Sequence, residues 1–86
     1  MRLDKYLKVS RIIKRRTVAK EACDGGRVSI NDKKAKAGTE VKLDDLIAIR
    51  FASKIIKARI IGISEHIKKE EAKMMYEIIE GEEDTE

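Results

Sequence analysis

The sequence predicts an α+β fold in which two N-terminal helices pack on a small, mainly antiparallel sheet, with a C-terminal helix after it. Apolar residues recur at helical spacing up to residue 24, alternate between 46 and 63, and return to helical spacing from 68 to 79. Because 86 residues suit one small domain, we expect a single unit over residues 1–79. Five acids in the last seven residues predict a disordered acidic tail over 80–86.

The helical half spans about residues 2–24. Leu3, Tyr6 and Leu7 are spaced as one stripe of a first helix within residues 2–9. A second helix is expected within 14–24, with an apolar face formed by Val18, Ala19, Ala22 and Cys23. Its start is open, because Thr17 is a candidate N-cap and a start near Lys14 fits equally well.

The sheet is expected over about residues 27–63. Gly25-Gly26 ends the second helix, since one glycine can adopt the left-handed conformation of a helix end. Asn31-Asp32 and Asp44-Asp45 are predicted turns. The predicted extended segments are 27–30, 33–37, 41–43, 46–51 and 55–63, and the last two should form an antiparallel hairpin.

The C-terminal segment has two interpretations. Ala72, Met75, Tyr76 and Ile79 fit a helix over about 68–79. Residues 76–79 could instead continue as a strand.

Positive charge is concentrated in the N-terminal half. Residues 1–37 hold 12 Lys and Arg against 4 Asp and Glu, whereas residues 38–86 hold 8 against 12. Such segregation favours one face that meets a polyanion over a surface that is merely solvated. Lys14, Arg15 and Arg16 crowd the start of the second helix, where they are unfavourable for the helix alone. A phosphate bound there would reverse that effect, although a solvent-screened basic loop is the alternative.

Several other classes of function are disfavoured. Cys23 is the only cysteine, so no internal disulfide can form, and its position on an apolar face suggests a small core residue. A lone histidine, His66, is weak ground for a metal site. No phosphate-loop motif follows the double glycine, and no stretch is long enough to span a bilayer. We therefore expect a cytoplasmic protein without catalytic activity, cofactor or membrane partner.

The quoted residues resemble a known family. Arg2-Leu3-Asp4-Lys5-Tyr6-Leu7, Arg16-Thr17-Val18-Ala19 and Gly25-Gly26-Arg27-Val28-Ser29-Ile30-Asn31 are similar to the S-four RNA-binding domain, with Asp32 and Asp44 standing where turn glycines are usual. The residues 2–21 and 68–79 look like the small stand-alone members of this family, of the RqcP (YabO) type, to which heat-shock protein fifteen is related.

This resemblance implies a function in ribosome-associated quality control. It implies binding to ribosomal RNA and peptidyl-tRNA on an obstructed large ribosomal subunit, together with an RqcH-type factor that adds C-terminal alanine tails. The alternatives are a heat-shock or ribosome-assembly factor and, less favoured, a DNA-binding module. Nothing in the sequence demands more than a monomer.

The expected phosphate contacts are all cationic, and two neighbouring side chains could orient them. The predicted RNA-binding residues are Arg2, Lys5, Lys8, Arg11, Lys14, Arg15, Arg16 and Lys20, with Arg27 and Lys33 at the flank; the orienting candidates are Asp4 and Thr17. For Asp4 we favour a simpler role over the orienting one, since an acid in the first turn stabilises a helix N-terminus. With only three aromatic residues in the chain, a platform for stacking single-stranded bases is disfavoured.

Overall fold

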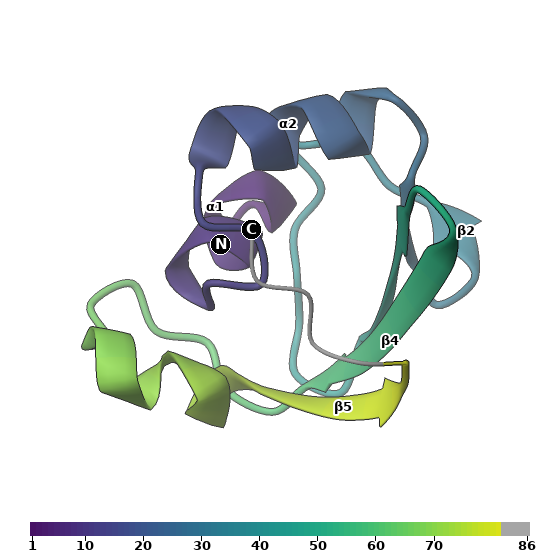
Figure 1. Cartoon of the computed structure of the whole chain (residues 1–86). Helices are drawn as coiled ribbons and strands as arrows, with labels where there is room; N and C mark the ends of the chain where they lie inside the picture. Colours follow the sequence, from purple (N-terminus) through teal and green to yellow (C-terminus); the bar gives the residue numbers. More distant parts are fainter. Residues whose placement is uncertain (82–86) are drawn as a thin grey trace.

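The computed structural model describes residues 1–81 and consists of two helices, a five-stranded sheet and a short 3-10 helix (Figure 1). In chain order the elements are α1 (Leu3–Val9), α2 (Arg16–Asp24), β1 (Val28–Ile30), β2 (Lys33–Lys34), β3 (Leu46–Phe51), β4 (Lys54–Ile60), η1 (Lys69–Met75) and β5 (Tyr76–Glu80). The α+β prediction is confirmed.

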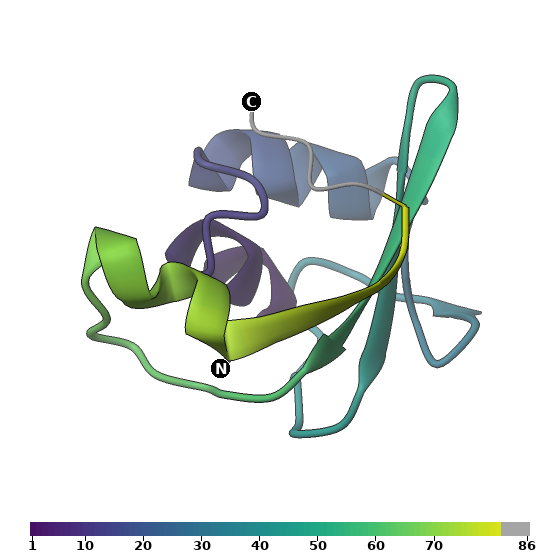
Figure 2. The ribbon, with the colours of Figure 1, turned by 60° about the horizontal axis from the view of Figure 1, so that its bottom comes forward.

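The sheet is antiparallel throughout, with the strand order β2-β1-β3-β4-β5. Figure 2 shows it nearly edge-on, with α1, α2 and η1 on one side. The other face of the sheet, which we call the outer face, carries no helix in the described part of the chain. The helices are therefore presented on one side of the molecule.

Strand alternation explains how the helices are held. Ile47, Ile49, Ile56 and Ile60 are buried, whereas Lys57 and Arg59 between them are exposed. Leu3, Tyr6, Leu7 and Ile13 close the core from the helical side and are fully buried. Burial of side chains of this size contributes about 1.5–3 kcal/mol each, so helix docking depends on the sheet's inner face.

Helix α1 is also tied to segments far away in sequence. The Tyr6 hydroxyl donates a hydrogen bond to the Met75 carbonyl at 2.8 Å. The Leu3 and Asp4 amides donate to the carbonyls of Thr39 and Ala37. A helix of seven residues is unstable alone, so these bonds and the core fix its position.

The predicted turns have the expected geometry. Asn31, Asp32 and Asp44 adopt positive φ angles of 52°, 69° and 72°, and Gly26 closes α2 at +75°. Asn and Asp tolerate this conformation, which explains why Asp32 and Asp44 can stand in glycine positions.

The predicted helix over 68–79 is wrong for its last four residues, 76–79. Residues 69–75 form η1, but Tyr76–Glu80 forms β5, as in the alternative strand interpretation. Tyr76 pairs with Ile60 and Glu77 with Arg59, so β5 satisfies the open edge of β4. That long-range pairing outweighs the local helical spacing.

Other boundaries differ by a few residues. Strand β4 ends at Ile60, β2 contains only two residues, and residues 41–43 form no strand, although Arg2 and Glu40 form an isolated bridge. Helix α2 begins at Arg16 with Arg15 as its N-cap, so Thr17 lies inside the first turn and does not cap it. The predicted acidic tail lies largely outside the described residues, which end at 81.

Candidate nucleic-acid interface

A buried carboxylate joins the two helices. Asp4 is 2% exposed and receives hydrogen bonds from the side chains of two arginines. Arg2 donates from Nε to Oδ1 at 3.2 Å and from Nη2 to Oδ2 at 3.3 Å. Arg16 donates from Nε to Oδ2 at 3.4 Å. We call Arg2, Asp4 and Arg16 the Asp4 cluster.

The carboxylate of this cluster is held in its charged form. Burial alone would raise the pKa of Asp4, but the hydrogen bonds from Arg2, the Lys5 backbone amide and Arg16 together outweigh burial and lower it. The Lys5 amide bond to Oδ1 is 2.8 Å long. Asp4 therefore contacts both arginines, which is the arrangement that the less favoured of its two predicted roles requires.

The Asp4 cluster lies in a surface hollow of about 340 Å³, which Thr17 and Lys20 also line. The Arg2 and Arg16 side chains remain about half exposed, at 52% and 48%. Three predicted cations thus converge around one buried acid. Thr17 lines the hollow instead of capping α2.

Three further predicted cations lie on or beside α1 and α2, and they differ in exposure and in ion pairing. Lys14 and Arg15 are exposed at the start of α2, beside Arg16. Lys5 is half-buried and its ammonium group forms an ion pair with Glu65. Lys5 is therefore already partly neutralised by the chain itself.

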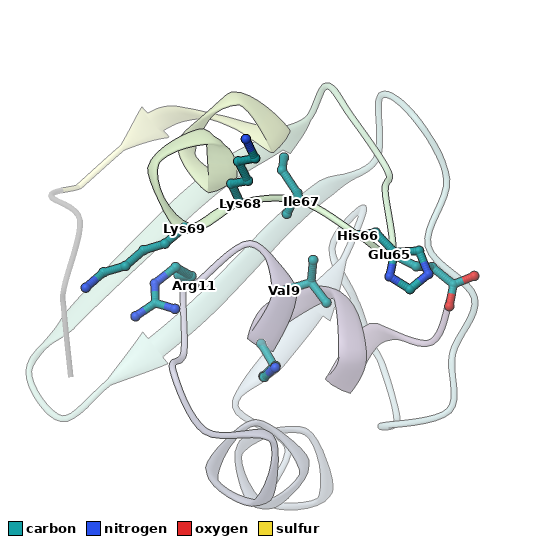
Figure 3. A pocket seen from close by; sticks show the side chains of 8 residues that line it. Val9, Arg11, Glu65, His66, Ile67, Lys68 and Lys69 are labelled. Atoms are coloured by element: carbon teal, nitrogen blue, oxygen red, sulfur yellow. The ribbon is translucent and has the colours of Figure 1, made fainter.

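Lys8 and Arg11 lie at the opposite end of α1 from the Asp4 cluster. They line a second hollow, of about 440 Å³, together with Val9 and residues 65–69 (Figure 3). We call this hollow the Arg11 groove. Its far wall carries His66, Lys68 and Lys69, which come from the segment that leads into η1.

Arg27 and Lys33 do not join the helical cations. Arg27 lines a hollow of about 240 Å³ with Ser29, Ala48 and Arg50, which alternate with the buried strand residues and so face outward. Lys33 is exposed on β2, at the far edge of the sheet. The structure separates these two residues from the helical side.

The sequence prediction missed Lys68 and Lys69, which lie opposite Arg11. Lys34 and Arg50 line the hollow beside Arg27, away from the helical side, and are not counted as part of the candidate interface. The Lys68-Lys69 pair was visible as a local charge doublet. Its proximity to α1 depends on the path of residues 61–68 and could not be read from spacing.

Two kinds of reactive group are relevant to catalysis in the described residues, the single thiol and clusters of possible metal ligands. Burial raises the pKa of the Cys23 thiol to about 11, so little thiolate exists near neutral pH. Within residues 1–81 no group of three or more His, Cys, Asp or Glu side chains is placed to hold a metal ion. Among the same residues no helix is long and apolar enough to cross a membrane.

The sequence is similar to a known family of domains and to named proteins from bacteria. The family model described as S4 domain matches residues 1–47. A protein named RQC P-site tRNA stabilizing factor from Listeria monocytogenes is 57% identical over 82 residues, which cover 95% of this chain and 89% of that protein. The protein of the same name from Halalkalibacterium halodurans is 54% identical over 78 residues, which cover 91% and 89%.

A solved structure has the same fold. The trimeric structure of heat shock protein 15 from Vibrio cholerae superposes with a TM-score of 0.83 at 30% identity, covering 91% of this chain and 80% of that one. The resemblance predicted from the sequence is therefore confirmed.

Proposed function

The chain belongs to the S4 domain family, and from this membership we propose that it is a non-catalytic RNA-binding protein of ribosome-associated quality control. It binds ribosomal RNA and peptidyl-tRNA on obstructed large ribosomal subunits. There it supports an RqcH-type factor during C-terminal alanine tailing, in the cytoplasm and as a monomer. Residues 1–79 form the RNA-binding unit.

The observation that carries this proposal is the Asp4 cluster. Arg16 uses only Nε to contact Asp4, and within the described residues no hydrogen bond or ion pair engages its two terminal nitrogens. A guanidinium held in this way presents two parallel donors to a phosphate. Because the carboxylate fixes the arginine side chain beforehand, less rotamer entropy is lost on binding.

The kind of RNA follows from what the helical side lacks. Tyr6 and Tyr76 are buried and Phe51 is half-buried, so the chain's three aromatic rings do not form an exposed platform for unstacked bases. Phosphate contacts by clustered cations suit structured RNA, which proteins recognise mainly by shape and backbone. Ribosomal RNA and tRNA are of this kind.

The names of the relatives support the proposed role in ribosome-associated quality control. The name that two relatives at 57% and 54% identity share refers to tRNA in the P site, and the matches cover about nine-tenths of each protein. The similarity to heat shock protein 15 favours a second candidate, a ribosome-associated heat-shock factor. That structure is only 30% identical, so we place quality control first.

The test is affinity purification of the tagged protein from stressed cells, with sequencing of bound RNA and detection of both ribosomal subunits. Large subunits that carry tRNA and lack small subunits are expected. Free messenger RNA, or no RNA, would contradict the quality-control assignment. Loss of RqcH-type factor from the same preparation after ribonuclease treatment would show that the two proteins meet on the ribosome and not directly.

A further inference from the structure

The Arg11 groove is strongly cationic. Lys8, Arg11, Lys68 and Lys69 line it, and Glu65 is its one carboxylate. Glu65 is already paired with Lys5. No ion pair within residues 1–81 engages the four cations, so their mutual repulsion is relieved only by solvent or by a bound anion.

Figure 3 shows how two of these side chains are placed. Arg11 extends from the end of α1 and Lys69 from the start of η1, and both reach toward the same side of the groove. The two residues are 58 positions apart in the sequence. The fold thus places two like charges on the same groove, where their mutual interaction is unfavourable.

The backbone at Arg11 is a second, independent observation. Arg11 follows the C-cap Ser10 and has a φ of 64°, in the left-handed region. Its amide donates to the Lys8 carbonyl at 3.1 Å, so it occupies the position after a helix where glycine is usual. Four other non-glycine residues of the described chain have positive φ, but three of them are Asn or Asp, which tolerate it.

No polar contact among the described residues explains why a long side chain occupies this position. Arg11 is half-buried, and within the described residues no hydrogen bond or ion pair holds its guanidinium. Backbone strain of this kind is retained where a side chain serves a function that glycine cannot.

We propose that the Arg11 groove binds a second phosphate of the RNA backbone, held between Arg11 on α1 and Lys69 on η1. This proposal rests on the RNA-binding function given above. The groove and the Asp4 cluster lie at opposite ends of a seven-residue helix, about 10 Å apart along its axis, so one phosphate cannot occupy both. The C-terminal segment is therefore part of the interface, beyond residues 1–47 that match the S4 family model.

The test compares Arg11→Gly and Lys69→Gln with the wild-type protein. The probe is purified bacterial large ribosomal subunits, with affinity measured over a salt series and thermal unfolding measured in parallel. Arg11→Gly should lose about five- to fifty-fold in affinity and reduce the salt slope by about one. Its melting temperature should stay the same or rise, because glycine relieves the left-handed backbone.

Two further variants make the outcome specific. The double variant Arg11→Gly/Lys69→Gln should lose less than the product of the two single losses, because both residues hold one phosphate. Arg50→Ala removes the same charge from the outer face, and its affinity should stay close to that of the wild type. Unchanged affinity of both single variants, or a lower melting temperature for Arg11→Gly, would overturn the proposal.

The Arg16→Ala variant separates this failure from failure of the proposed function. If Arg16→Ala weakens binding while Arg11→Gly and Lys69→Gln do not, the RNA-binding function stands and the second phosphate site is wrong. If the wild-type protein itself does not bind the subunits, the proposed function is wrong as well.

Discussion

Replacing Arg16 by alanine should weaken RNA binding strongly while leaving the fold almost intact. Within the described residues the Arg16 side chain makes one hydrogen bond, of 3.4 Å to Asp4, and it is 48% exposed. Exposed ion pairs contribute about 0.2–1 kcal/mol. This range applies because the buried Asp4 carboxylate keeps its hydrogen bonds from Arg2 and from the Lys5 amide after the substitution. Because α2 begins at Arg16, removing a cation from this end of the helix offsets part of that loss.

The expected loss of stability and the expected loss of RNA affinity differ enough in size to be measured separately. A loss of up to 1 kcal/mol lowers the melting temperature of a domain this small by at most about 4–8 °C. A hydrogen bond to a charged group contributes about 1.5–3 kcal/mol, which corresponds to a loss of about 10- to 150-fold in affinity. The slope of log affinity against log salt should also fall by about one.

The assay is equilibrium binding to large ribosomal subunits at several salt concentrations, with circular dichroism melts of the same samples. Arg50→Ala is the matched control, because Arg50 is also exposed but lies on the outer face of the sheet. Equal losses for the two variants would mean that net charge alone drives binding. That result would refute the assignment of the interface to the helical side.

The remaining predictions concern stability. Because the pKa of Asp4 is lowered in the folded protein, its charged carboxylate stabilises the fold fully above the ordinary value of 3.8. That stabilisation is lost as the pH falls through the lower folded-state pKa. The stability of Asp4→Asn should therefore fall less steeply with decreasing pH, and the same acid dependence as the wild type would contradict the Asp4 cluster. Tyr6→Phe should lower the free energy of unfolding by about 0.5–1.5 kcal/mol, as expected for one hydrogen bond. The loss stays small because the Met75 carbonyl still accepts hydrogen bonds from the Ile61 and Gly62 amides. A loss above about 3 kcal/mol in urea titrations would show that the hydroxyl does more than donate one hydrogen bond.

Local patterns in the sequence were sufficient for the helices and turns. The spacing of Leu3, Tyr6 and Leu7 places α1 correctly, and all three residues are buried. Asn31-Asp32 adopts the positive φ angles that its side chains tolerate. In each case the physical cause lies within a few residues of the feature it explains.

The features that were missed depend on distant segments. Ala72 and Met75 are spaced as a helix and Tyr76 and Ile78 alternate as a strand, so local spacing fits both structures; the open edge of β4 decides between them. Asp4 and Arg16 are twelve residues apart, and only the docking of α2 on α1 brings them together. The role of Asp4 as a link between two arginines was therefore less apparent than its simpler role at the helix start.

The hydrogen bond from Tyr6 to Met75 has a consequence for how this protein is made. Helix α1 is too short to be stable alone, and one of its side chains donates a hydrogen bond to a residue 69 positions later. A nascent copy must therefore expose Met75 outside its own ribosome before α1 can form its full set of contacts. We expect chains arrested before Met75 to bind the ribosomal RNA around them more weakly than the full sequence does, which crosslinking of such arrested chains can measure.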